Sequence, residues 1–417
     1  MESSSVPSTR HKIGDSHERF VILDIALALL IITPAVVTYW RVTWMLFDTY
    51  LLPEYRTLST VTSLCIGFFG VTIFTVVQYK LKTFVNSWRN SFSYYLVTRC
   101  YTALFGLACV NSWRGIWDGM NLLTGTSLPA VFTSVFLSIG ILVVMGTLRN
   151  IIAPPVATLS DHYHGYFEVP TLFRKGGRSN TGYSCLYVLD SFFSVCIIGT
   201  LVVVVWRGVW AIMDKYLYPE QEQMSAWLSL VIGYSVVLVA FSLQYWVKNL
   251  VRRIKGIKRI IVVDIYLLFS FFGAVNVWRG IWNMLDVYFL PEAQVTSYWI
   301  SHIACFIILV ALNSSNSILV RGVYMDGEGD GTQCVDFPCY YVRLLVQKRK
   351  RKKNNVVEKE DKEMIQVKGN LEEEEEIEQS VMGKLLTNSV IKENGDIKAN
   401  KNGENIKTIV QYDNNIV

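Results

Sequence analysis

Four copies of one motif gather the residues of this chain that are best able to bind a charged solute. Each copy has a tryptophan followed directly by arginine, a second tryptophan four residues after the first, and a carboxylate or amide four residues further on. On a helix these positions fall within about 100° of one another, so they share one face. The copies are Trp40, Arg41, Trp44 and Asp48; Trp113, Arg114, Trp117 and Asn121; Trp206, Arg207, Trp210 and Asp214; and Trp278, Arg279, Trp282 and Asp286.

Two interpretations of this stripe are open. Ionisable groups inside a membrane often mark the path of a solute, so four arginines at one depth predict a site for an ion or an anionic solute. Alternatively, the tryptophans form an interfacial belt, and each arginine reaches the interface or pairs with the acid of an adjoining copy. Repetition of an anchor is natural in a duplicated scaffold, and it favours the second interpretation.

A second set of polar residues also repeats along the chain. It lies near the ends of the hydrophobic segments that are far from the Trp-Arg motifs, which are the predicted cytoplasmic ends. It consists of Asp24, Gln78, Asp190, Gln244, Asp264 and Asn316. In a transporter these residues would form a gate, whereas in a scaffold they would make interhelical hydrogen bonds, which favour association by roughly 0.6 kcal/mol each.

Other chemistry is not indicated. The run Asp161-His162-Tyr163-His164 lacks further ligands for a metal, and the acidic, glycine-rich run 326–331 lacks the final glutamate of a calcium loop. The chain has no phosphate-binding loop and no nucleophile or zinc-hydrolase motif. We therefore expect no enzymatic activity, no metal, no cofactor and no nucleic-acid partner.

The elements that carry these residues are predicted to be membrane helices. The chain is 52% hydrophobic and 18% charged, with a mean hydropathy of +0.32, whereas a typical soluble domain is roughly 25% charged. This composition excludes a soluble globular enzyme. Crossing a bilayer takes about 20 mostly apolar residues. Eight segments fit: 22–47, 58–79, 95–120, 128–149, 186–213, 225–247, 260–286 and 297–319.

Lysine and arginine in the short loops predict the orientation. Sixteen basic residues lie in the segments on the side of the N-terminus, and Arg56 and Lys215 are the two on the other side. Because cytoplasmic loops carry the excess of basic residues, both termini are predicted to be cytoplasmic and the motifs to lie toward the exoplasmic side.

The motif spacing predicts an internal duplication. The first tryptophans are 73 residues apart in the first pair of copies and 72 in the second, and the two pairs are offset by 166 and 165. We therefore expect an all-α membrane protein of four parallel two-helix repeats. The predicted parts are a cytoplasmic N-terminus (1–19), a first membrane half (20–155), a cytoplasmic loop (156–184), a second membrane half (185–322) and a cytoplasmic tail (323–417).

The tail carries three features of its own. Cys334 and Cys339 follow the last predicted span, where palmitoylation and ordinary free thiols are both plausible. An unbroken basic run suits anionic lipid of the inner leaflet: Lys348, Arg349, Lys350, Arg351, Lys352 and Lys353. The composition from 350 onward cannot bury a core, so this part is predicted to be disordered.

Taken together, the Trp-Arg-Gly-x-Trp copies and the Asp-x-Tyr-Leu-x-Pro ends resemble the fuseless family of invertebrate multi-pass proteins over residues 20 to 322. The resemblance implies a non-enzymatic presynaptic protein of the plasma membrane that places voltage-gated calcium channels at the active zone and supports transmitter release. Calcium-channel subunits or active-zone proteins would then be partners, besides the bilayer. The first copy departs from the pattern with Val42 in place of glycine, and the second copy lacks the Tyr-Leu-x-Pro end. A transporter or channel of parallel repeats is the alternative function.

Overall fold

A computed structural model describes most of the chain up to residue 337 and two short pieces beyond it. The described residues are 22–86, 92–161, 165–173, 185–290, 293–326, 331–337, 364–366, 368 and 377–384. The chain divides into a compact unit, Met1–Arg343, and a second unit, Leu344–Val417. In the second unit the described residues are helical and exposed, and the basic run 348–353 lies outside the described residues.

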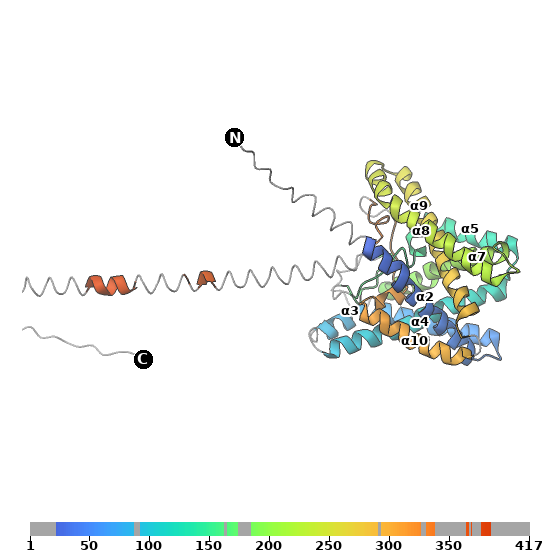
Figure 1. Cartoon of the computed structure of the whole chain (residues 1–417), viewed down its shortest axis with the longest axis horizontal. Helices are drawn as coiled ribbons and strands as arrows, with labels where there is room; N and C mark the ends of the chain where they lie inside the picture. Colours follow the sequence, from blue (N-terminus) through green and yellow to red (C-terminus); the bar gives the residue numbers. More distant parts are fainter. Residues whose placement is uncertain are drawn as a thin grey trace, which may run out of the picture. The chain divides into compact units, whose positions relative to one another are not determined.

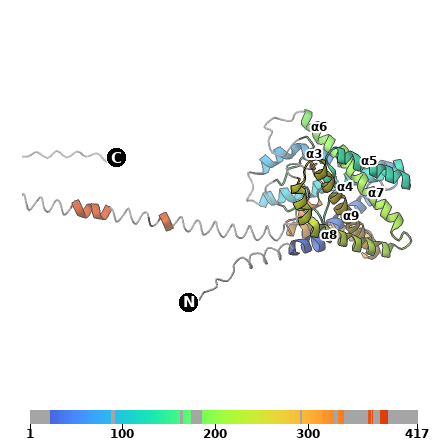
Figure 2. The same cartoon turned by 90° about the horizontal axis from the view of Figure 1, so that it is seen from above.

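Every long element in the described part of the first unit is a helix, as the sequence predicts (Figures 1 and 2). Its elements are η1 (Ala28–Ile32), α2 (Thr33–Tyr50), α3 (Arg56–Asn86), α4 (Phe92–Thr124), α5 (Leu128–Val144), η2 (Leu148–Ile151), α6 (Cys185–Phe193), η3 (Ser194–Ile198), α7 (Gly199–Tyr216), α8 (Glu222–Arg253), α9 (Ile257–Tyr288), α10 (Gln294–Ala311) and η5 (Ser315–Ile318). The π-helical turns η1 and η3 lie 166 residues apart, at matching positions of the two halves.

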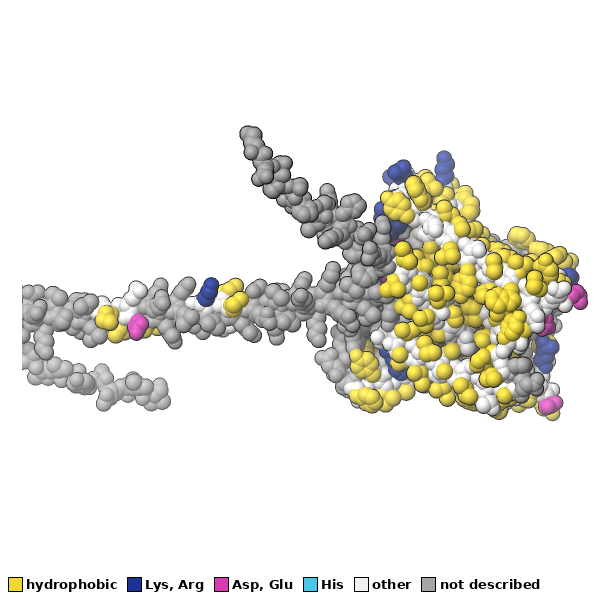
Figure 3. Space-filling model, viewed as in Figure 1, with side chains coloured by type: hydrophobic (Ala, Val, Ile, Leu, Met, Phe, Trp, Pro, Cys, Tyr) yellow, Lys and Arg dark blue, Asp and Glu magenta, His cyan; other side chains and the backbone are white. Residues whose placement is uncertain are grey.

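Six of the described helical segments are long and apolar enough to cross a membrane. They are Ile22–Tyr50, Arg56–Val85, Cys185–Tyr216, Glu222–Arg253, Ile257–Tyr288 and Gln294–Ala311. The sequence predicts eight spans, and the two further segments are α4, which is not among the six, and α5, which is apolar but has 17 residues. Apolar side chains cover most of the face seen in Figure 3, and the described charged side chains lie mainly at its borders. This surface is that of a membrane protein.

Each motif helix packs along the second helix of the preceding copy. The pairs are α3 with α4, α5 with α7, α8 with α9, and α10 with α2, so the last pair joins the end of the chain to its beginning. In two pairs the motif glycine allows this approach, because an added methyl group would lie 2.6 Å from the backbone nitrogen of Leu64 at Gly115 and 2.7 Å from that of Leu230 at Gly280. Val42 holds the same place in the first copy, where it packs in a small cluster with Tyr298 of α10.

All four motif helices end at the same backbone corner. The residue twelve positions after the first tryptophan has a positive φ in every copy: Leu52, Gly125, Tyr218 and Leu290, at 51°, 62°, 50° and 47°. The second copy lacks the Tyr-Leu-x-Pro sequence, yet Gly125 gives it the same turn at no steric cost. The second copy therefore differs from the others in sequence at this corner and has the same backbone conformation.

Two segments outside the long helices form a further buried layer, which we call the loop layer (described residues 145–161 and 165–173 of the first segment, and 312–326 and 331–337 of the second). Each contains a 3-10 turn, η2 or η5, and both have buried apolar side chains, including Ile151, Phe167 and Phe337. The second segment continues past residue 322, where the sequence places the start of the tail. The packed part of the chain therefore includes residues 323–326 and 331–337.

Candidate functional site

The eight motif tryptophans form two stacked rings. In the first ring, formed by Trp40, Trp113, Trp206 and Trp278, neighbouring indole centroids are 5.4, 5.6, 5.5 and 5.7 Å apart, and each contact is edge-to-face. In the second ring, formed by Trp44, Trp117, Trp210 and Trp282, the distances are 5.9, 5.8, 5.8 and 5.9 Å, with interplanar angles of 85–86°. Edge-to-face contacts of this kind contribute about 0.5–1.5 kcal/mol each beyond burial.

The rings fix the relative directions of the helices that carry them. Both rings connect the copies in the same cyclic order, first to second to third to fourth and back to first. Two tryptophans four residues apart lie on one face, about one helical turn apart. Consequently α2, α4, α7 and α9 run in the same direction around a common axis.

The arginines form a third ring outside the tryptophans. Every guanidinium reaches the acid or amide of the preceding copy, and the first copy reaches the last. The bonds from Nε to Oδ1 are Arg114 to Asp48, 2.8 Å; Arg207 to Asn121, 2.9 Å; Arg279 to Asp214, 2.8 Å; and Arg41 to Asp286, 2.8 Å.

Serines of the paired helix hold two of the guanidinium groups further. Arg114 donates to Ser59 Oγ, at 2.9 Å, and to Ser63 Oγ, at 2.5 Å. Arg279 donates in the same way to Ser225 Oγ, at 2.7 Å, and to Ser229 Oγ. The side chain of Arg279 is 3% exposed and that of Asp214 is 53% exposed, so the cation is the buried partner. In both groups all three guanidinium nitrogens donate hydrogen bonds to side chains of neighbouring helices, so these cations tie the helices together.

The bond between the second and third copies is different. Arg207 has the neutral Asn121 as its partner, donates to the carbonyl of Gly125 at 2.5 Å, and keeps a buried Nη1 with no hydrogen-bond partner among the described residues. The second copy instead carries an acid one turn earlier, at Asp118. The Oδ2 atom of Asp118 lies 4.0 Å from Nε of Arg114.

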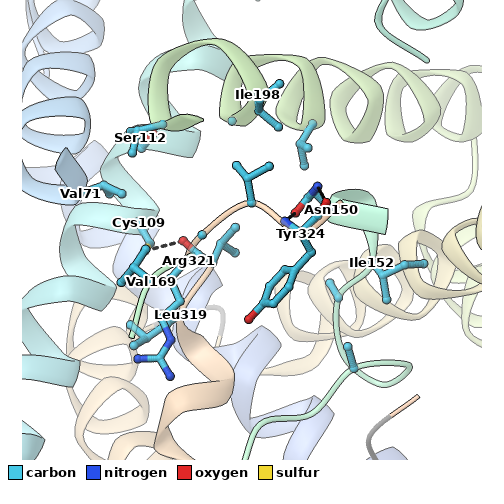
Figure 4. A pocket seen from close by; sticks show the side chains of 18 of the residues that line it. Val71, Cys109, Ser112, Asn150, Ile152, Val169, Ile198, Leu319, Arg321 and Tyr324 are labelled. Carbon is cyan, nitrogen blue, oxygen red and sulfur yellow. Dashed lines mark hydrogen bonds between the residues drawn. The ribbon is translucent and has the colours of Figure 1, made fainter. Parts of the chain in front are cut away.

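Two cavities lie on the axis, on either side of the first ring. One, of about 210 Å³, is lined by all eight motif tryptophans and Asp118. The other, of about 260 Å³, lies between the first ring and the loop layer and is lined by residues such as Cys109, Asn150 and Arg321 (Figure 4). The indole nitrogens of Trp40, Trp206 and Trp278 fasten the loop layer to this ring by donating to the carbonyls of Ile318, Ile151 and Pro154, at 2.9, 2.9 and 2.7 Å.

The second polar set lies mostly against the loop layer. Gln78 donates to the carbonyl of Val169 and accepts from its amide, at 3.0 and 2.7 Å. Asp190 accepts from Thr171 Oγ1 at 2.5 Å and from the amide of Phe173 at 3.2 Å.

The other members of this set are less alike in their contacts. Gln244 donates to Asp336 at 3.0 Å, and Asn316 donates its backbone amide to Asp161 at 2.7 Å. Asp24 and Asp264 are both buried. The set is therefore divided between contacts to the loop layer and positions within the helices.

Sequence reasoning missed a reciprocal pair of aspartates in the loop layer. Asp161 accepts the amides of Ser315 and Asn316 at the start of η5, at 3.0 and 2.7 Å. Asp326, which the sequence presents only as part of an acidic, glycine-rich run, accepts the amides of Leu148 and Arg149 at the start of η2, at 2.5 and 2.9 Å.

Each segment of the loop layer therefore caps a turn of the other segment. Burial raises the pKa of Asp326, and the amides of Arg149 and Leu148 partly oppose this rise. Asp161 has a further partner in Arg99 of α4, which holds the position that Asp264 has in the fourth copy, 14 residues before the first motif tryptophan. The residue types Gly146 and Asn313 were a signal in the sequence, because glycine and asparagine favour the positive φ that both adopt. Each lies two positions before the first amide that the aspartate caps.

Two other features of the sequence, the run 161–164 and the cysteines of the tail, lie only partly within the described residues. No group of three or more potential metal ligands occurs among them, and His162 and His164 lie outside them. Cys334 is 2% exposed, so an acyl chain on its sulfur would displace its packing, and Cys339 lies outside the described residues.

Comparison with models of protein families gives a match over most of the membrane part. A family model described as Fuseless matches residues 19–319. Neither the curated proteins nor the solved structures contain a match to the chain.

Proposed function

The chain belongs to the Fuseless family, as its motifs suggested, and from this premise we propose that it is a non-enzymatic organiser of voltage-gated calcium channels at the presynaptic plasma membrane. The family resemblance implies this role. In this proposal the membrane part is a rigid body, and the segments on its cytoplasmic side offer the surface for channel subunits or active-zone proteins.

We include eight spans and four parallel two-helix repeats in the proposal. Trp113 and Trp117 of α4 lie in the same rings as tryptophans of three helices that qualify as spans, so α4 runs at the same depth as they do. The second helix of the same copy, α5, packs along α7, which belongs to a qualifying span, and α5 is long enough to cross most of a bilayer.

The observation that carries the organiser role is the closed ring of paired arginines. A transport site needs charged groups that can exchange a protein partner for a solute, whereas Arg114 and Arg279 have an acid and two serines each. Their arrangement favours a fixed structure over a moving one.

Topology is the first part of the proposal to test. Tags at residue 5 and residue 410 are expected to be protected in intact cells, and a tag in the loop Pro219–Ser225 is expected to be accessible, because of the basic residues on the side of the N-terminus. An accessible tag at residue 410 in intact cells would refute eight spans with cytoplasmic termini.

The organiser role is tested by two measurements on the full chain. Tagged protein purified from neurons is expected to carry calcium-channel subunits, and the same protein in liposomes is expected to show no saturable solute flux. Flux in liposomes without channel subunits in the neuronal preparation would reverse the conclusion.

The basic run 348–353 is proposed to hold the tail at anionic lipid. Each of its residues near the surface contributes up to about 1 kcal/mol of binding free energy. A peptide spanning the run should bind vesicles with anionic lipid and not neutral vesicles, and a peptide with the six residues changed to glutamine should bind neither. Equal binding of the native peptide to both kinds of vesicle would contradict an electrostatic anchor.

A transporter or channel is the second candidate, and one observation favours it. Both axial cavities share the first tryptophan ring as a wall, so that movement of these four indoles would join them into one path. The liposome flux measurement separates this candidate from the organiser.

A further inference from the structure

The cavity between the tryptophan rings has the chemistry of an aromatic cage. Eight indoles line it, and Asp118 is the only charged side chain among its described lining residues. Indole faces attract cations through their quadrupole, and cages of aromatic side chains are a general solution for binding ammonium groups whose nitrogen carries methyl groups.

The dimensions of the rings suit such a group. Four centroids at the corners of a square with sides of 5.4–5.9 Å lie about 4 Å from its centre, inside the roughly 6 Å range of cation–π attraction. A cation on the axis between the rings would therefore be in range of indoles from all four motif helices.

One carboxylate makes the cage electrostatically asymmetric. The positions that correspond to Asp118 in the other copies are Met45, Ala211 and Asn283, so the acid is present on one side alone. Two guanidinium groups, those of Arg114 and Arg56, act on this carboxylate. Arg114 directs its hydrogen bonds to Asp48, Ser59 and Ser63, and its Nε is 4.0 Å from Asp118. The Asp118 side chain, 16% exposed, thus supplies negative charge to the cavity without a short ion pair to Arg114.

The same lining disfavours a bare inorganic cation. Calcium takes 6–8 oxygen ligands and magnesium needs a near-octahedral shell, whereas tryptophan supplies no oxygen. An alkylated ammonium group has a diffuse charge and apolar methyl groups, so indole faces and a single carboxylate can replace its hydration.

We propose that the cavity between the two tryptophan rings, with Asp118, binds a quaternary ammonium group. The group can belong to a free organic cation or to the choline headgroup of a lipid, and the chemistry of recognition is the same for both. This binding site does not depend on the organiser role, since it rests on the cage alone.

The test uses the full-length protein in nanodiscs of phosphatidylglycerol, which has no choline. Tetramethylammonium and choline are titrated while tryptophan fluorescence and thermal unfolding are followed, with potassium chloride at equal ionic strength and the neutral isostere 3,3-dimethyl-1-butanol as controls. A saturable fluorescence change and a raised melting temperature are expected with the two ammonium compounds alone.

Variants locate the site. Asp118→Asn is expected to weaken binding about tenfold through loss of the facing charge. Asp118→Glu should retain most of the affinity, which shows that a loss in the amide variant is not a folding defect. Trp117→Leu removes one wall and should lower affinity strongly, whereas Trp246→Phe, at an exposed position of α8, should leave it unchanged.

The source of the group is resolved by repeating the titration in phosphatidylcholine nanodiscs. Loss of the response to free choline there means that the lipid headgroup occupies the cage, and an unchanged response means that a free cation is the ligand. Either result supports the proposal. No response in phosphatidylglycerol from a folded protein, or an equal response to the neutral isostere, would overturn it, and neither result would bear on channel co-purification.

Discussion

Two bonds of the arginine ring have the same geometry and different charge. Between the third and fourth copies, Arg279 is paired with Asp214 and with two serines. Between the second and third copies, Arg207 is paired with Asn121 and a backbone carbonyl, and one of its nitrogens has no partner among the residues described. The backbone frame therefore tolerates an amide in place of the acid, and the second copy carries its negative charge at Asp118, which lines the cavity together with the eight motif tryptophans.

Loss of the charged bond is expected to have the largest effect. Arg279→Ala removes four hydrogen bonds and leaves Asp214 without its cation, and because that carboxylate is half-exposed we expect a loss of about 2–4 kcal/mol. Arg207→Ala should cost less, about 1–2 kcal/mol, since no acid is left unpaired. Thermal unfolding and surface delivery measure both, with Arg253→Ala at an exposed helix end as the control.

A double-mutant cycle sharpens this result. Adding Asp214→Ala to Arg279→Ala should restore part of the lost stability, because no unpaired charge remains. Strictly additive losses would show that the two side chains do not interact.

The second-largest loss of stability is expected when the ion pair of Arg279 and Asp214 is replaced by a neutral hydrogen bond. Asp214→Asn reproduces the partner that Arg207 has naturally, but in a copy where Ala211 stands at the place of Asp118. We expect a loss of about 1–3 kcal/mol, because the buried guanidinium loses its counter-charge. Ala211→Asp added to this variant should recover some stability. A fully stable single variant would mean that the charge of Asp214 has no structural role.

The reverse change should have a smaller and opposite effect. Asn121→Asp gives Arg207 an acid and a charge-assisted hydrogen bond, which is worth about 1 kcal/mol more than a neutral one. Asp118, three residues away on the same helix, repels the new carboxylate, so the gain should be visible in an Asp118→Asn background and largely cancelled in the native one. Equal melting temperatures for Asp118→Asn with and without Asn121→Asp would refute this account.

The helix corners give the smallest expected difference. Leu52 and Leu290 hold a left-handed conformation that costs a residue with a side chain about 1–2 kcal/mol, so Leu52→Gly or Leu290→Gly should raise stability by up to about 1 kcal/mol after the loss of side-chain contacts. Gly125→Ala should lower it by about 1 kcal/mol, although nothing lies within 4 Å of the added methyl group. A gain in stability from Gly125→Ala would show that this corner is not held as the other three are.

The motif residues show how far the sequence could predict this site. Their common face follows from spacing alone, and a separation of seven residues excludes a close pair of arginine and aspartate within one copy. Which neighbouring copy supplies the acid depends on how the helices are arranged around the axis, and no local pattern contains that order. The tryptophan rings could not be predicted because they too depend on the arrangement of the helices around the axis. In addition, aromatic residues at a helix end also fit an interfacial belt.

Asp161 and Asp326 show where local reasoning stops. Each caps a turn more than 150 residues away in the chain, so neither lies near its partners in the sequence. Likewise α4 has the length of a span but is not among the six candidates, and its depth is indicated by Trp113 and Trp117.

The bond between Arg41 and Asp286 also has a consequence for biosynthesis. The two residues are 245 positions apart, and at 5–20 residues per second a ribosome needs roughly ten to fifty seconds to make the intervening chain. During that interval Arg41 of the first motif helix is already present, whereas its partner Asp286 has not yet been synthesised. The early half of the nascent chain is therefore the part most exposed to membrane quality control, and a chain terminated before residue 286 is expected to be degraded rather than to accumulate as a half-molecule.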